Sequence, residues 1–157
     1  MSMTSFRKEM FQVFTDAMSA ADWPALAAAG FQSPADVVTP IRHYEGRTYK
    51  DGKNPAKSYA EIYMRSAIGL QASLANHDGV RRWEDAGTLW IMCFGSDTKG
   101  EGLEISELIA TIASEAYQGV STENCAWFRN VRKINVGSSG GWYHINVLVD
   151  YEYDEVR

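Results

Sequence analysis

Three histidines, His43, His77 and His144, are the side chains of this sequence best suited to acid–base chemistry or metal binding near neutral pH. They lie in three unrelated settings: near the end of a short apolar run, within a turn-forming sequence, and on the polar side of an alternating segment near the C-terminus. None has the HxxxH or HxxE spacing of a metal site, and no GxSxG motif is present. The sequence therefore predicts structural or solvated histidines, with no catalytic, cofactor-binding or metal-binding residue and no enzymatic activity.

Four carboxylates, Asp150, Glu152, Asp154 and Glu155, concentrate negative charge near the C-terminus. Carboxylate oxygens are ligands for hard cations, and such a cluster could hold one across a subunit interface. Charged side chains at a strand end also prevent unwanted strand addition. For this reason we predict a solvated strand end rather than a cation site.

Two short segments place arginine next to aromatic residues, Arg-Arg-Trp at 81–83 and Trp-Phe-Arg at 127–129. This combination is enriched at protein interfaces, and it also stacks on nucleic-acid bases. Ordinary cross-strand pairing in a sheet is an equally good explanation for each segment. Five tryptophans and eight tyrosines favour a subunit with large buried contacts. The net charge of −5 argues against broad nucleic-acid binding, which requires clustered Lys and Arg.

The size of the chain predicts a single domain spanning residues 1–157, with 45% hydrophobic residues to form its core. Cys93 and Cys125 are far apart and lack CxxC spacing, so we expect both to be small buried residues in a reducing compartment. The N-terminal sequence lacks the apolar core of a signal peptide, and no apolar run approaches membrane-spanning length. We expect a soluble cytoplasmic protein that does not bind membranes.

Helical periodicity marks two segments, residues 5–21 and a second stripe from Ile105 to Ala116 that ends at Gly119. A turn or short second helix is expected at 24–29, and most of 31–58 is expected to be loop.

Alternation of apolar and polar residues predicts strands at 38–44, 59–74, 80–94, 125–136 and 143–153. The turn at 76–79 and the glycine-serine tract at 137–141 would close two long hairpins. Residues 89–94 are apolar on both sides, which predicts a helix over one face and sheet or another subunit over the other. The predicted class is α+β, with a largely antiparallel or mixed sheet of two long hairpins packed by two main helices.

The C-terminal segment carries a sequence pattern of its own. Residues 125–131 read CAWFRNV, residues 136–137 read VG, residues 140–147 read GGWYHINV and residues 150–155 read DYEYDE. This ending resembles the WFRxV…VG…GxWYxxNV…xYEYDE pattern of the phage tail-terminator-like proteins of long-tailed phages and prophages. The similarity extends over about residues 59–155, whereas the segment 31–58 does not align with the family.

The resemblance implies a small structural subunit that forms a ring, expected to be hexameric, on the head-proximal end of the tail tube. Such a ring terminates tail polymerisation and mediates head–tail joining during virion assembly. Implied partners are further copies of the chain, the tail tube protein and the head–tail connector or neck protein, with no sequence-specific nucleic acid. The candidate subunit or partner interface comprises Asn76, His77, Asp78, Arg81, Arg82, Trp83, Trp127, Arg129 and Trp142.

Two alternatives remain open. A head-closure or neck connector protein occupies the same junction of the virion and would have a similar surface. A small-molecule-binding α+β domain is a different class, and it would require a concave apolar pocket with converging polar groups.

Overall fold

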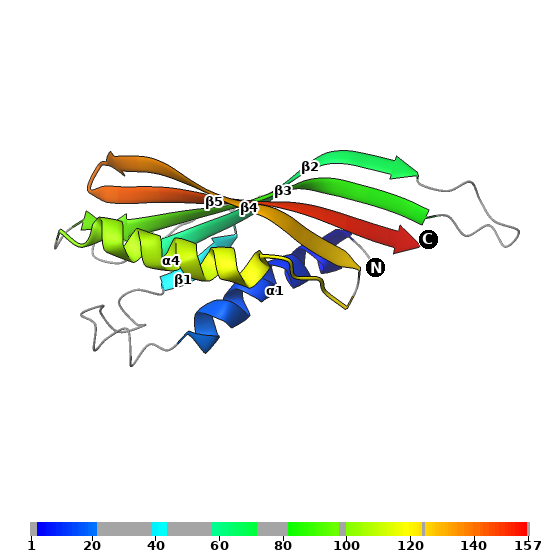
Figure 1. Ribbon diagram of the computed structural model, residues 1–157, viewed down its shortest axis with the longest axis horizontal. Helices are drawn as coiled ribbons and strands as arrows, with labels where there is room; N and C mark the ends of the chain where they lie inside the picture. Colours follow the sequence, from blue (N-terminus) through cyan, green and yellow to red (C-terminus); the bar gives the residue numbers. More distant parts are fainter. Residues whose placement is uncertain are drawn as a thin grey trace, which may run out of the picture.

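A computed structural model describes residues 3–21, 39–43, 58–71, 82–97, 100–123 and 125–156 (Figure 1). The described helices are α1 (Met3–Ala20) and α4 (Gly102–Tyr117). The described strands are β1 (Thr39–His43), β2 (Tyr59–Gln71), β3 (Arg82–Ser96), β4 (Ala126–Ser139) and β5 (Trp142–Val156). The predicted α+β class is confirmed, and the two helices and five strands agree with the predicted segments to within a few residues. The predicted helix or turn at 24–29 and the turn at 76–79 lie outside the described residues.

The five strands form one sheet in the order β1-β2-β3-β5-β4. Strand β1 pairs with β2 in parallel, whereas the other three pairings are antiparallel. The central pairing of β3 with β5 runs without interruption from Arg82 opposite Val156 to Ser96 opposite Trp142. The two hairpins are therefore joined along their full length, and the sheet is strongly twisted (Figure 1).

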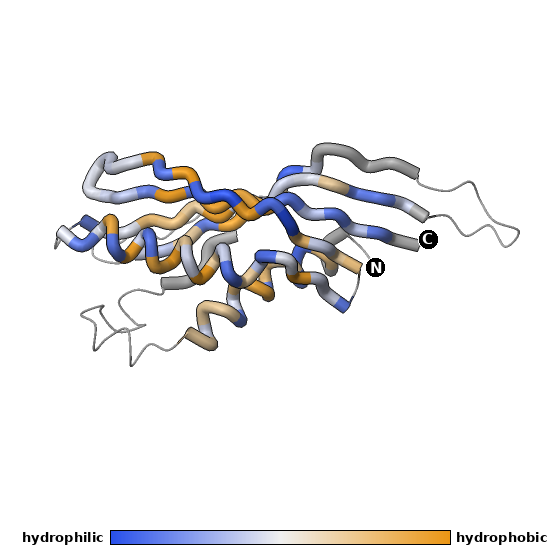
Figure 2. Tube along the Cα trace, viewed as in Figure 1, coloured by the Kyte–Doolittle hydropathy of each residue, from blue (hydrophilic) through white to orange (hydrophobic). Residues whose placement is uncertain are grey.

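Both helices pack on the same side of the sheet (Figure 1). Their apolar stripes face alternate residues of the strands, because side chains of a strand point to opposite faces in turn. Apolar residues on this side of the two hairpins therefore form the core. Figure 2 shows hydrophobic residues along both helices and along the strands beside them. The fully buried core residues on these elements include Phe6, Met10 and Phe14 of α1, Ala110, Ala113 and Tyr117 of α4, Ile62 of β2, Leu89, Ile91 and Cys93 of β3, Ala126 of β4, and Val147 and Val149 of β5.

Tyr117, at the end of α4, connects the two helices. Its side chain is fully buried, and its hydroxyl donates a 2.6 Å hydrogen bond to the backbone carbonyl of Met10. Its ring lies edge-on to Phe128, with 4.9 Å between the centroids. Burial raises the pKa of Tyr117 well above its usual range, so the hydroxyl stays protonated and remains a donor.

The glycine-serine tract at 137–141 differs from its prediction as a five-residue connection. Strand β4 continues through Ser139, and only Gly140 and Gly141 form the turn, with φ of 59° and 79°. Positive φ at both central residues is the requirement of a type I′ hairpin turn. Gly137 also has a positive φ of 99°, but it lies within β4 at a shift of register after Asn135.

Two further glycines allow close approach of the backbone. At Gly95, near the end of β3, a Cβ atom would collide with the carbonyl oxygen of Gly102 and would lie 2.7 Å from its carbonyl carbon. At Gly87 a Cβ atom would collide with the carbonyl oxygen of Arg65 and lie 2.7 Å from the hydroxyl oxygen of Tyr151. The predicted loop at 95–102 is correspondingly shorter than expected, because β3 extends to Ser96 before the chain turns into α4.

Candidate interaction surface

The side of the sheet away from the helices is called the open face here, and its central residues are Tyr63, Trp90, Met92, Phe94, His144 and Asn146. On β3, Leu89, Ile91 and Cys93 are fully buried against the helices, while the alternating residues of the open face are half-buried. No described helix lies over this face (Figure 1). The predicted helix over one side of segment 89–94 is thus confirmed, and the predicted cover over its other side stays a prediction.

An aromatic cluster occupies one end of the open face, where β2 and β5 begin and β3 ends. The ring of Phe94 stacks on His144 and on Tyr59, with centroid distances of 4.3 and 4.7 Å. Trp142 lies edge-on to Tyr59 at 5.0 Å. His144 is therefore a member of an aromatic stack, which agrees with its predicted structural role.

A second aromatic pair lies further along the open face. Tyr63 and Trp90 stack across β2 and β3, with 6.0 Å between their centroids. The guanidinium carbon of Arg65 lies 5.6 Å from the first ring centre and 5.3 Å from the second. These distances permit cation–π attraction, which holds the arginine against its own sheet.

Charged residues gather where β4 and β5 pair beyond the aromatic half of the sheet. Arg129 forms an ion pair with Glu152, and Arg132 pairs with Asp150 at 2.8 Å. Asp150 also accepts hydrogen bonds from the Asn130 amide (3.2 Å) and the Thr88 hydroxyl (3.4 Å). Two members of the predicted carboxylate cluster, Asp150 and Glu152, thus bind arginines of the neighbouring strand, whereas the side chain of Glu155 lies outside the described residues. No group of three potential ligands among the described residues is arranged to hold a metal ion.

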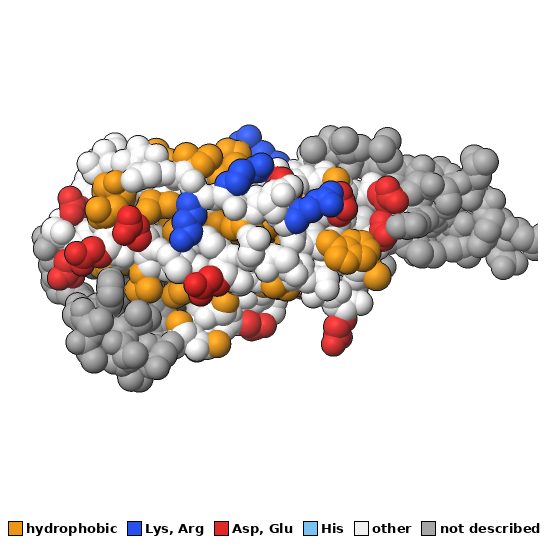
Figure 3. Space-filling model, in the orientation of Figure 1, with side chains coloured by type: hydrophobic (Ala, Val, Ile, Leu, Met, Phe, Trp, Pro, Cys, Tyr) orange, Lys and Arg blue, Asp and Glu red, His pale blue; other side chains and the backbone are white. Residues whose placement is uncertain are grey.

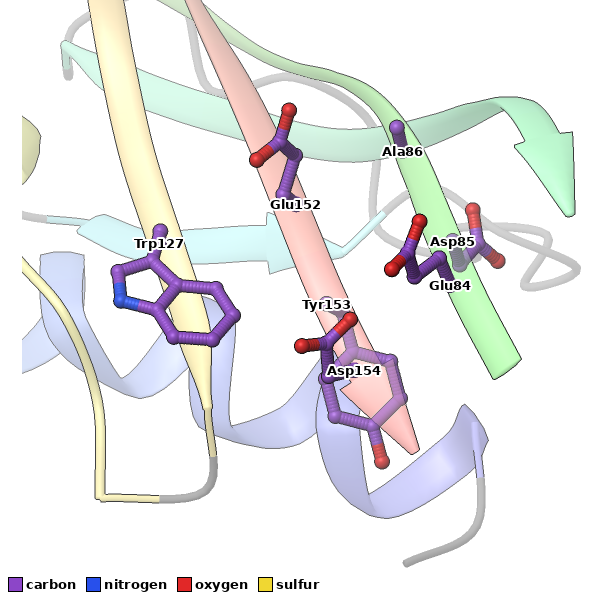
Figure 4. A pocket seen from close by; sticks show the side chains of 7 residues that line it. All are labelled: Glu84, Asp85, Ala86, Trp127, Glu152, Tyr153 and Asp154. Atoms are coloured by element: carbon purple, nitrogen blue, oxygen red, sulfur yellow. The ribbon is translucent and has the colours of Figure 1, made fainter. Parts of the chain in front are cut away.

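Trp127 borders a pocket of about 340 Å³ at this charged end (Figure 4). Its other lining residues come from β3 and β5, and four of them are acidic: Glu84, Asp85, Glu152 and Asp154. The Trp127 side chain is 43% exposed and lies beside these carboxylates on β4. An acidic pocket with an aromatic wall is suited to a positively charged group, and it differs from the apolar pocket expected of a small-molecule site.

The predicted interface residues do not form one patch. Trp127 and Arg129 lie together near the start of β4, whereas Trp142 lies at the opposite end of β5, and Trp83 is half-buried near the start of β3. Asn76, His77, Asp78 and Arg81, together with the side chain of Arg82, lie outside the described residues. The sequence reasoning missed the most exposed apolar side chains of β4, Ile134 at 46% and Val136 at 55%. Their alternation with polar neighbours looks the same as that of a buried strand, so periodicity alone gave no signal.

The prediction for the two cysteines is half wrong. Cys93 is fully buried, and burial raises the pKa of its thiol well above the usual range. Cys125, by contrast, is exposed and has a positive φ of 65° just before β4. Its surroundings are those of a connecting segment rather than of the core.

We expect a thiol reagent such as Ellman's reagent to modify one thiol per folded chain rapidly at pH 8, and a second only after denaturation. The accessible thiol is Cys125, because a buried thiol with a raised pKa supplies almost no thiolate. The Cys125→Ser variant serves as the control and should lose the rapid phase. Rapid release of two equivalents from the folded chain would contradict the burial of Cys93.

Comparison with known proteins gives no relative: no protein-family model matches the chain, and a search of the curated proteins finds no match. Within the described ranges, neither helix combines the length and the apolar character required to cross a lipid bilayer. The role of the chain therefore has to be argued from its own residues and surfaces.

Proposed function

We propose that this chain is a structural phage protein that forms a ring on the head-proximal end of the tail tube, terminates tail polymerisation and mediates head–tail joining. The observation that carries the proposal is the terminal hairpin. It brings the residues of the WFR…WYxxN…YEYDE pattern onto two directly paired strands, β4 and β5. Because the matching residues all belong to this one hairpin, the resemblance supports the proposal more strongly than matches scattered over the fold would.

The surfaces of the chain support a role in assembly. The open face presents half-buried aromatic residues, and β4 exposes Trp127, Ile134 and Val136. Aromatic side chains bordered by arginine are typical of protein interfaces. A ring subunit requires such surfaces, because its neighbours cover them after assembly.

The proposal has definite partners. Further copies of the chain would form a hexameric ring, the tail tube protein would contact one side of it, and the head–tail connector or neck protein would contact the other. The protein would be made in the bacterial cytoplasm and end at the tail–head junction of the virion. The acidic pocket beside Trp127 would accept a basic side chain from one of these partners.

Deletion of the gene from its phage or prophage tests the proposal. Negative-stain electron microscopy of the lysate would measure tail lengths and count joined particles. Overlong tails of variable length beside unattached filled heads are expected for a lost terminator. Tails of normal length that fail to join would instead establish a head-closure protein, and intact virions would refute both structural roles.

Substitution Trp127→Ala is expected to reduce phage titre by at least about tenfold while leaving the chain folded. The side chain is 43% exposed, so its removal costs little core packing, whereas exposed tryptophans are frequent sources of binding energy. Titre is measured by complementing the deletion, and folding by the thermal midpoint of the purified variant. Leu103→Ala removes a similarly exposed apolar side chain from α4 and serves as the control. A lowered midpoint with normal titre for Trp127→Ala would contradict the expectation.

A further inference from the structure

The outer edge of β4 is paired over only part of its length. Residues near the end of α4 bond to its beginning: the Phe128 amide donates to the Val120 carbonyl, and the Thr122 amide donates to the Ala126 carbonyl, both at 2.9 Å. Beyond Phe128 no described residue pairs with this edge, whose inner side is bonded to β5. Residues 130–139 are called the free edge of β4 below.

The opposite border of the sheet is also partly open. Strand β1 pairs with β2 only between Thr39 opposite Tyr59 and His43 opposite Ile62. In the part of the chain that the structure describes, no strand lies outside residues 63–71, which are called the free edge of β2. The two free edges lie on opposite borders and toward opposite ends of the sheet, since Tyr59 and Ser139 both lie at the end where β5 begins.

Natural proteins protect exposed edges with charges, proline, β-bulges or short strands. Strand β4 has register shifts after Arg129 and after Asn135, and between them residues 132–135 pair regularly with β5. Two basic residues of β4 are held by partners within the chain rather than projecting from its edge to block another strand. Arg132 binds Asp150, and the Lys133 ammonium donates to the Thr111 hydroxyl (3.0 Å). Ile134 and Val136 remain exposed beside them. Figure 3 views the molecule from this side and shows hydrophobic side chains reaching the surface among the basic ones. An edge of this kind is suited to pairing with another strand.

We propose that the free edge of β4 adds to the free edge of β2 of a second copy, so that adjacent subunits share one continuous sheet. The topology supplies the required polarity. Strands β2 and β3, β3 and β5, and β5 and β4 are each antiparallel, so β4 runs opposite to β2. When copies are related by rotation, β4 of one and β2 of the next therefore pair antiparallel, which is the slightly more stable arrangement.

The faces of the sheet restrict the register of this contact. Ile134 lies opposite Asn146 on the open face, and Tyr63 and Arg65 lie on the same face of β2. Side chains must stay on their own face across a shared sheet, so Ile134 is expected opposite Arg65 or Tyr63 of the neighbour.

The contact is head-to-tail, because it joins two different borders. Head-to-tail contacts produce closed rings when the rotation closes, whereas pairing of β4 with β4 would produce only two-fold dimers. The inference rests on the proposed ring and specifies its subunit contact. A groove of about 380 Å³ next to the free edge of β4, between Ala110 of α4 and Ile145, offers room for side chains of the added strand.

Paired cysteines distinguish these arrangements. In a Cys125→Ser background, Ile134→Cys is combined with Arg65→Cys or with Tyr63→Cys, and the oxidised protein is run on a non-reducing denaturing gel. The same gel is run on tails isolated from a lysate that carries the variant. We expect one double variant to give a ladder of linked chains and every single variant to remain unlinked.

Each other result would overturn the inference. A linked dimer from Ile134→Cys alone would show two β4 edges meeting, and the lack of a ladder from both double variants, in purified protein and in tails, would exclude the β4–β2 contact. The proposed function is judged separately by tail length in the deletion strain, so the failures are distinguishable.

A second measurement follows the strength of association. Val136→Lys is expected to weaken self-association at least about tenfold, because the contact would bury an unpaired charge. Light scattering with gel filtration measures the oligomer, and Leu103→Lys on α4 is the matched control. Equal association of both variants and the parent chain would contradict the proposed edge.

Discussion

Substitution Gly95→Ala is expected to lower the free energy of unfolding by at least about 3 kcal/mol, because the added methyl group has no space. A Cβ atom at this position collides with the backbone of Gly102, and 2.7 Å separates it from the carbonyl carbon. Backbone atoms cannot rotate away as the end of a flexible side chain can. The junction of β3 with α4 would have to move, and α4 carries part of the core. Urea denaturation followed by circular dichroism measures the change.

Gly119→Ala provides the comparison for this result. Gly119 has a φ of +68°, but an added Cβ atom meets nothing within 4 Å. Its substitution is expected to cost only the conformational penalty of about 1–2 kcal/mol. Equal losses for both variants would mean that close packing against Gly102 does not determine the effect at Gly95.

Substitution Phe6→Ala is expected to destabilise the fold by about 3–5 kcal/mol, because it removes a fully buried ring and leaves a cavity. Phe6 stacks on Tyr153 with 3.8 Å between ring centroids and lies 5.7 Å from the ring of Tyr151. These contacts attach α1 to the last strand. Chemical denaturation gives the change in unfolding free energy. A loss below about 1 kcal/mol, similar to that of the exposed control Leu103→Ala, would show that α1 contributes little to the core.

Helices and strands were predictable from the sequence where only one face of the element is buried. Segment 143–153 alternates because Val147 and Val149 face the helices while Asn146 and Asp150 face away from them. Both main helices were found because their apolar stripes cover the sheet. The position of the turn within the glycine-serine tract was harder to predict, since five consecutive small residues permit several turns. Only the pairing register of β4 with β5 shows that Gly140 and Gly141 form the turn.

The candidate surface was less predictable, because it depends on register and on sheet order. Arg129 lies beside Glu152, but the two are far apart in sequence and their pairing follows from the alignment of β4 with β5. Trp127 and Trp142 looked equivalent in the sequence, yet they lie at opposite ends of the hairpin. Ile134 and Val136 are exposed because β4 is an edge strand. The alternation of apolar and polar residues predicts a strand, but it does not show whether that strand lies at the edge or in the centre of the sheet.

The packing of α1 against β5 has a consequence for the timing of biosynthesis. Helix α1 leaves the ribosome well before its main aromatic partners, Tyr151 and Tyr153 of β5, have been synthesised. At about 5–20 residues per second, α1 waits on the order of ten seconds before those partners exist. The fold is therefore completed only after β5 has been synthesised. A truncated product would keep the apolar side of α1 exposed, which makes it a target for chaperones and proteases rather than a competitor of intact subunits.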